Sequence, residues 1–398
     1  MPNPTSRGRA AAVLTASLAV ACLAACGGAS KNAGTTSPSD ASTRAGNDHA
    51  ATVTITAADG CSPDRSSLAA GAVTFNVTNK DATGVSEVEL LSGERIVGEK
   101  ENLPPGFSGT FAVDVEAGTY TLYCPGAAKE NTAIAVTGAA PAAANASASA
   151  LLATGAKDYA SYVDTQVGYL VASVQTLDAA LHGTDLAAAQ TGYKRARPYY
   201  EKIEPVAESF TSGTDNLDSD IDARAGDVPA AQWEGFHRIE MGLFADHSLT
   251  GLASFGDGLL ADVKKLQSLT AGLTYKPYEL ANGAQELLDE VASTKITGEE
   301  ERYSHIDLLD FQANDEGAEQ AFADLQPGLA KIDASLAATI SANFAALNTL
   351  VDKYRSSSDA SGFVLYATLT DGDKQAFAAA VKAVQEPLSQ VASKVATS

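Results

Sequence analysis

The sequence predicts a two-part protein: a small antiparallel β-sandwich over residues 51–138, followed by an all-α helical bundle over residues 151–398. Two changes along the chain predict this order. Apolar and polar residues alternate with a period of two in the first region, and apolar residues recur with a helical period in the second. Between them, residues 139–150 are rich in Ala and Ser, which indicates a linker.

The first 25 residues have the order of an export signal. Arg7 and Arg9 supply the positive start, and the apolar run that ends at Ala25 is short for a transmembrane helix. It closes in Leu-Ala-Ala-Cys-Gly, which matches a bacterial lipobox and predicts cleavage before Cys26 with a lipid on its sulfur. The Gly/Ser/Thr-rich residues 26–50 then form a flexible tether. We expect an extracytoplasmic protein, lipid-anchored to the outer face of the cell membrane (the periplasmic side); a soluble secreted protein is the alternative.

The net charge of −22, from 49 acidic and 27 basic residues, excludes nucleic acid as a partner. An acidic exported protein attracts cations or basic partners. Acidity also serves solubility, so the charge by itself assigns no function.

The β-region retains two cysteines, Cys61 and Cys124, after the signal is removed. A disulfide is the default for such a pair outside the cytoplasm, and a second metal site that uses both sulfurs with nearby acids such as Glu87 is the alternative. A blue-copper site needs two histidines. No His occurs between residues 50 and 181, which excludes that type of site.

The run Gln-Trp-Glu-Gly-Phe-His-Arg-Ile-Glu-Met-Gly-Leu-Phe, residues 232–244, is the most informative part of the helical region. On a continuous helix His237 and Glu240 share one row with Trp233 and Phe244, so two polar groups point into an apolar stripe. A buried unpaired carboxylate is costly, and Glu/His pairs at i, i+3 recur as metal ligands inside helical bundles. The alternative is that the pair bonds internally or to an Arg of a neighbouring helix.

Two further segments carry candidate ligands. Glu201 and Glu204 are spaced i, i+3, but the helical pattern alone places them opposite an apolar row and facing solvent. Asp310 shares a helical face with Asp307 and Phe311, which predicts a buried polar cluster. Oxygen donors with one imidazole suit iron, manganese or zinc better than copper(I).

Three runs resemble the EfeO family of bacterial iron-uptake proteins, together with the lipobox and the His-poor β-region. They are Ala-Arg-Pro-Tyr-Tyr-Glu-Lys-Ile-Glu-Pro (196–205), Gly-Phe-His-Arg-Ile-Glu (235–240) and Lys-Ile-Thr-Gly-Glu-Glu-Glu-Arg-Tyr-Ser-His (295–305). The resemblance covers essentially the whole mature chain and implies a cupredoxin-like domain before an imelysin-like one. It also implies partners: a membrane iron permease and a haem-dependent peroxidase.

The resemblance also implies a ligand set in the helical domain. It marks His237, Glu240, Glu201 and Glu204 as metal ligands, with Asp218 as a further candidate; Asp310 is added by the helical-face argument. The family sometimes places an acidic ligand shortly before the second cysteine, where this chain has Thr119. That departure counts against a second metal site in the β-domain.

We therefore expect a binding protein, not an enzyme, that captures ferrous or ferric iron as cargo and passes it to a permease. Zinc and copper are alternative ions. The alternative function is a zinc metallopeptidase of the imelysin type, although hydrolytic zinc motifs use two histidines where this motif has one. A third reading is a surface adhesin or polysaccharide-binding lipoprotein with a structural metal.

Overall fold

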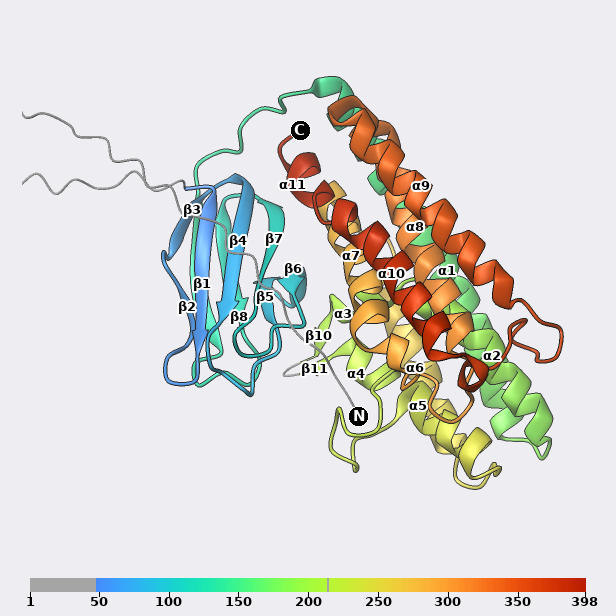
Figure 1. Ribbon diagram of the computed structural model, residues 1–398. Coiled ribbons are helices and arrows are strands. Elements are labelled where there is room, and N and C mark those ends of the chain that lie inside the picture. Colours follow the sequence, from blue (N-terminus) through green and yellow to red (C-terminus); the bar gives the residue numbers. More distant parts are fainter. Residues whose placement is uncertain (1–47, 213–214) are drawn as a thin grey trace, which may run out of the picture. The chain divides into compact units, whose positions relative to one another are not determined.

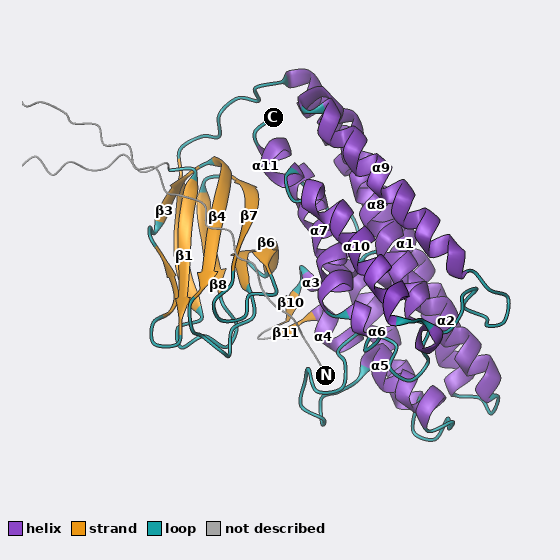
Figure 2. Cartoon of the chain, in the orientation of Figure 1, coloured by secondary structure: helices purple, strands orange, loops and turns teal. Residues whose placement is uncertain are grey.

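A computed structural model describes residues 48–212 and 215–398 of the chain (Figure 1). The predicted signal peptide 1–25, the lipidation site Cys26 and most of the tether lie outside these residues. Strands occupy the first part of the described chain and helices the second, which confirms the predicted fold class (Figure 2). The described residues fall within one compact unit.

The first sheet has four strands. In spatial order they are β2 (Gly60–Pro63), β1 (Ala50–Thr56), β4 (Gly71–Asn79) and β7 (Ser108–Val115). Alternate residues of β4, such as Val73, Phe75 and Val77, are buried, as a period of two requires. The β1–β4 pair is parallel, whereas β4–β7 is antiparallel.

The second sheet has five strands. In spatial order they are β3 (Ser67–Ala69), β9 (Asn131–Thr137), β8 (Gly118–Tyr123), β5 (Val88–Ser92) and β6 (Arg95–Lys100). Its pairs are antiparallel except β3–β9. Cys61 of β2 and Cys124, just after β8, are joined in a disulfide. The bond therefore links a strand of one sheet to the end of a strand of the other.

The helical region follows, with small strands β10 (Thr211–Ser212) and β11 (Asp215–Asn216) inserted. Its α-helices are α1 (Ala146–Leu181), α2 (Leu186–Glu201), α3 (Glu204–Glu208), α4 (Leu217–Ile221), α5 (Gly235–Glu240), α6 (Ala253–Thr270), α7 (Pro277–Ser293), α8 (Asp307–Ile332), α9 (Ala334–Val351), α10 (Asp371–Leu388) and α11 (Val391–Ala396).

Helix α1 forms the axis of the bundle and packs against α2, α6 and α8. Its buried residues Val163, Val167, Leu170 and Val174 recur at i, i+4, i+7 and i+11, as one helical face requires. The helix begins inside the stretch predicted to be a linker. It does so because the Asn145 side chain caps it by accepting a hydrogen bond from the Ala148 amide.

The helix predicted across residues 232–244 is shorter than its pattern suggests. Helix α5 begins at Gly235 and gives way to a π-helical turn, η1 (Met241–Ala245). Trp233 lies before the helix and donates from its indole nitrogen to the Ala223 carbonyl, 2.8 Å away. Gly235 has a φ of +79°, and a Cβ there would lie 2.2 Å from the Ile221 carbonyl oxygen, so only glycine fits. The predicted single row from Trp233 to Phe244 is therefore wrong, although His237 and Glu240 do share α5.

Among the described helices, the segment Ala334–Tyr354 is long and apolar enough to cross a membrane by length and composition. It comprises α9 and the turn after it, and α9 packs against α8 and α10. Ile340, Phe344 and Leu347 of α9 are buried.

Candidate metal centre

The imidazole of His237 is buried, with only 2% of the residue exposed. Its Nε2 atom makes no hydrogen bond, although carboxylate oxygens of Asp222 and Glu300 lie 3.6 and 3.4 Å away. The three side chains offer ligand atoms that all lie within 4.8 Å of one another. An imidazole nitrogen between two carboxylates is a donor set that suits iron, manganese or zinc.

Glu240 holds this imidazole in place. One of its oxygens accepts hydrogen bonds from the backbone amides of Tyr303 and Ser304, at 2.8 and 2.7 Å. The other faces Nδ1 of His237 at 3.5 Å. Both oxygens of Glu240 are therefore engaged, and Nε2 of His237 is left to face Asp222 and Glu300. This is the arrangement by which an outer carboxylate orients a ligating histidine.

His237, Asp222 and Glu300 lie close enough to influence one another's pKa values. Burial by itself would lower the pKa of His237, but the neighbouring carboxylates, Asp222 foremost, hold that pKa well above its usual value. Burial opposes ionisation of Asp222 and Glu300, yet nearby cations hold the pKa of both below the usual value; Arg197 acts on Asp222 and Lys295 on Glu300. The three side chains thus form an ionic cluster.

Asp222 and Glu300 were not among the ligands predicted from the sequence. Asp222 ends the acidic stretch 215–222, immediately after α4, and Glu300 is the middle residue of three consecutive glutamates. Both acidic runs are visible in the sequence. A residue in a loop, however, has no helical face that would show which acid of the run points inward.

Glu201 and Glu204 are buried, so the helical pattern that placed them toward solvent was misleading. Helix α2 ends at Glu201, and the chain turns at Lys202 and Ile203 before α3 begins at Glu204. Because of this break, both carboxylates face the interior. They belong with Asp222 to a further group of closely spaced ligand atoms.

Arg197 is fully buried and neutralises much of this region. Its guanidinium lies 3.0 Å from Glu300 and 3.5 Å from Asp310. It makes still closer ion pairs with Glu201 and Asp222. Asp310 therefore does lie in a buried polar cluster, and it forms a third group of ligand atoms with Glu201 and Glu300.

Lys295 is the second buried cation. Its ammonium lies 2.6 Å from Glu204, 3.0 Å from Glu201 and 3.8 Å from Glu300. Asp218 stands further out: it accepts a hydrogen bond from the hydroxyl of Tyr200, and burial raises its pKa to about 7.

A small cavity of about 10 Å³ adjoins the imidazole, room for one water-sized occupant. It is lined by His237, Glu240 and Glu300, and also by Glu299 and Arg302, which are exposed. The cavity therefore connects the buried groups with the protein surface.

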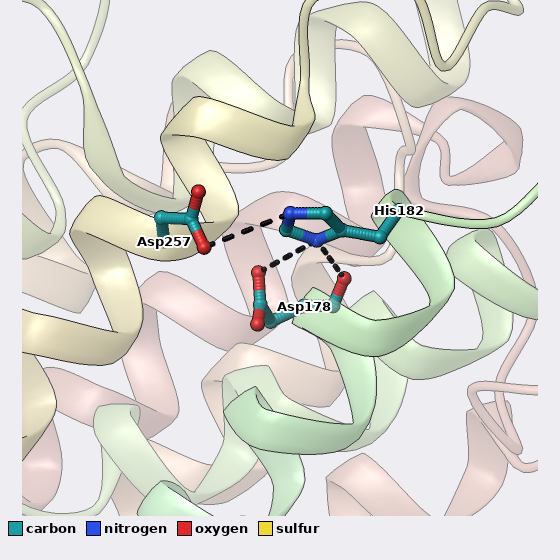
Figure 3. A group of neighbouring side chains, drawn as sticks. All are labelled: Asp178, His182 and Asp257. Atoms are coloured by element: carbon teal, nitrogen blue, oxygen red, sulfur yellow. Dashed lines mark hydrogen bonds and ion pairs between the residues drawn. The ribbon is translucent and has the colours of Figure 1, made fainter.

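A separate group of possible ligands lies at the surface. His182 at the end of α1 faces Asp178, 3.3 Å from Nδ1, and Asp257 of α6, 3.7 Å from Nε2 (Figure 3). About half of the His182 side chain is exposed, and Asp257 is more exposed still. This group was not selected from the sequence and lacks the burial of the His237 site.

The second metal site considered for Cys61, Cys124 and Glu87 does not have sulfur ligands. Both cysteines are consumed by the disulfide, so neither offers a thiolate. Glu87 remains, and it lies with two other glutamates of the β-region, Glu89 and Glu99.

Comparison with known proteins gives the following relatives. The family model described as imelysin (peptidase M75) matches residues 155–391. A protein of Escherichia coli O157:H7 named "Iron uptake system component EfeO" is 36% identical over 337 residues, which cover 83% of this chain and 88% of the relative. A protein of Yersinia pestis with the same name is 37% identical over 336 residues, covering 83% and 87%.

Proposed function

Because this chain belongs to the EfeO family of iron-uptake system components and contains an imelysin domain, we propose that it captures iron outside the cytoplasm and passes it to a membrane permease. Iron is the cargo in this proposal. His237, Asp222 and Glu300 are its ligands, and Glu240 orients the imidazole.

The observation that carries the proposal is the Nε2 atom of His237. This buried imidazole nitrogen makes no hydrogen bond, lies 3.4 and 3.6 Å from two carboxylates, and adjoins a small cavity that reaches the surface. A metal ion that replaces the proton of the imidazole would find three ligand atoms around it. Imidazole and carboxylate together suit ferrous or ferric iron. Zinc and copper would find acceptable donors here too, so ion selectivity is part of the test.

Arg197 and Lys295 support a carrier over a structural metal site. Arg197 already pairs with Asp222 and Glu300, and Lys295 lies 3.8 Å from Glu300, so burial of these acids does not require a bound ion. An incoming ion would exchange with these internal contacts, and its departure would restore them. A site of this kind can load and unload without unfolding the bundle.

The location and partners in the proposal rest on other observations. The lipobox that ends at Cys26 supports a lipid anchor on the outer face of the membrane. The relatives are named as components of an uptake system, which supports work with other proteins, and we assign these roles to a permease and a haem-dependent peroxidase.

The contacts of Glu240 count against the peptidase alternative. A zinc peptidase of this motif type would use its glutamate as a general base, close to a metal-bound water. Here Glu240 accepts from two backbone amides and faces Nδ1 of His237. We infer a binding role in place of peptidase chemistry.

Calorimetric titration of the protein with Fe²⁺ under anaerobic conditions, with ferric citrate, and with Zn²⁺ and Cu²⁺ tests the proposal. We expect iron binding in the wild type and a loss larger than about 10- to 100-fold in His237→Ala and in Glu300→Gln, since each removes a ligand and not an outer partner. The helical circular dichroism should stay unchanged.

His182→Ala is the matched control, because it removes an imidazole from the exposed group in Figure 3. We expect it to bind iron like the wild type. Iron binding that survives His237→Ala but falls in His182→Ala would refute the proposed site. Zinc-dependent peptide cleavage that disappears in Glu240→Gln would establish the enzyme instead.

A further inference from the structure

The end of helix α1 brings a histidine between two aspartates, one from α1 and one from α6. Asp178 and His182 lie one helical turn apart, so their side chains share a face, and Asp257 of α6 approaches the same imidazole (Figure 3). One ligand atom from each of the three residues lies within 4.8 Å of the others. We call these three residues the α1–α6 group. It shares no side chain with the site around His237.

The backbone determines which ring nitrogen of His182 can bind a metal ion. Nδ1 lies 3.0 Å from the carbonyl oxygen of Asp178. A carbonyl oxygen only accepts, so Nδ1 carries the hydrogen, and the lone pair of the neutral imidazole is on Nε2. Nε2 faces a carboxylate oxygen of Asp257, 3.7 Å away. Histidines that bind metals commonly donate their other ring N–H in this way, so the ring is oriented for an ion at Nε2.

Asp178 contributes a carboxylate oxygen that lacks a donor. Its side chain is 16% exposed, and Oδ1 is buried without a hydrogen bond, although Nδ1 of His182 lies 3.3 Å away. Gly256 of α6 lies opposite, where a Cβ would come within 2.7 Å of this oxygen. The glycine therefore lets α6 approach α1 closely and offers no polar side chain to Oδ1. A cation shared with His182 would supply the missing partner.

The other two side chains of the group are open to solvent, so an ion can reach them directly. The side chains of His182 and Asp257 are 47% and 66% exposed. Three protein ligands with one remaining position for water is a coordination that zinc adopts in proteins. The carbonyl groups at the end of α1 carry a partial negative charge, which also favours a cation at this place.

We propose that Asp178, His182 and Asp257 form a surface binding site for late first-row divalent ions, Zn²⁺ and Cu²⁺. One imidazole and two carboxylates are accepted ligands for both ions. Fe²⁺ stands near the bottom of the affinity order for such donors, so this site does not compete for iron. The proposal goes beyond iron capture and does not depend on binding at His237.

The test is calorimetric titration of the full-length protein with Zn²⁺, in the wild type and in His237→Ala. Both should bind zinc at the α1–α6 group. His182→Ala and Asp257→Asn should each weaken this binding by at least about tenfold, while Fe²⁺ binding stays at the wild-type level. Asp158→Asn removes an exposed carboxylate elsewhere on α1 and is the matched control, which should bind zinc as the wild type does.

Electron paramagnetic resonance of Cu²⁺ bound to His237→Ala shows whether an imidazole is a ligand. We expect hyperfine splitting from one nitrogen, and its loss when His182→Ala is added. His182 and Asp257 are exposed, so their variants should keep the helical circular dichroism of the wild type.

The proposal is overturned if His182→Ala binds zinc as the wild type does, or if the double histidine variant keeps the nitrogen splitting. Zinc binding that is abolished by His237→Ala alone would also overturn it, because that result assigns the ion to the other site. A protein that binds zinc at His182 but no iron would support this site and overturn the iron proposal, so the two proposals fail separately.

Discussion

The two buried carboxylate clusters of this protein differ in what neutralises them. Around His237, the fully buried Arg197 and Lys295 each contact several carboxylates. For Glu87, Glu89 and Glu99 of the β-sandwich, the described residues supply no ion-paired Lys or Arg, and one oxygen of Glu89 lacks a hydrogen bond. The first cluster can therefore stand without an added ion, whereas the second depends on protons or a bound cation. Buried carboxylates are thus neutralised by protein cations in one region and lack such partners in the other.

The largest expected effect comes from removing Arg197, the buried cation of the cluster around His237. Arg197→Met should destabilise the bundle by about 3–5 kcal/mol, because it leaves several buried carboxylates without their partner. Urea unfolding followed by circular dichroism measures the loss. Arg195→Met, on the same helix but exposed, is the control and should change stability by less than about 0.5 kcal/mol. If Arg197→Met is nearly as stable as the wild type, the carboxylates are protonated and need no cation.

The disulfide offers a way to separate the two regions. Replacing Cys61 and Cys124 by Ala should cost about 2–5 kcal/mol, since the bond closes a long loop, with a sequence separation of 63 residues. The loss should fall on the sandwich. Iron binding at His237 should survive, because its ligands all lie in the helical region. If iron affinity fell together with the stability of the sandwich, the two regions would not be independent.

The fold class followed from the sequence because two periodicities, two and 3.6, occupy separate stretches of chain. The candidate metal site could be predicted from the sequence only in part. His237 and Glu240 were found because two polar residues interrupted an apolar helical row. Glu201 and Glu204 were placed on the wrong side by the same rule, since the chain turns at Lys202 and a single helical wheel does not continue through the turn.

Asp222 and Glu300 could not be identified from the sequence for a different reason. Each lies outside a helix, and the fold alone decides which acid of an acidic run turns inward. The cluster of Glu87, Glu89 and Glu99 depends on strand register: Glu89 and Glu99 become neighbours because β5 pairs with β6. Register across a hairpin with a bulge is not fixed by either strand's own pattern.

The pH dependence of stability offers a further test of how the buried carboxylates are neutralised. Burial raises the pKa of Asp218 and of Asp307 to about 7, and burial together with Glu87 raises that of Glu89 to about 8. A folded state with such groups binds more protons than the unfolded chain above pH 4, so its stability falls as pH rises through 7 and 8. We expect the melting temperature without added metal to be roughly 3–8 °C lower at pH 8.5 than at pH 5.5.

The two clusters should respond differently to that change. The double variant Glu89→Gln and Glu99→Gln should show a smaller fall in melting temperature between pH 5.5 and 8.5 than the wild type, because Glu89 no longer titrates. A melting temperature that rises steadily from pH 5.5 to 8.5 would contradict the assigned direction of these pKa shifts.

The smallest effect concerns access to the His237 site through exposed charges. Glu299 lines the cavity beside His237, and its side chain is about two-thirds exposed, with Arg302 3.8 Å away. Glu299→Gln should slow iron association by about two- to threefold at low ionic strength and by less at 0.5 M salt, because an exposed charge steers an ion only within the Debye length. Stopped-flow binding measures the rate, and the equilibrium affinity should stay within about twofold. A large loss of affinity would place Glu299 among the ligands and move the site from the interior to the surface.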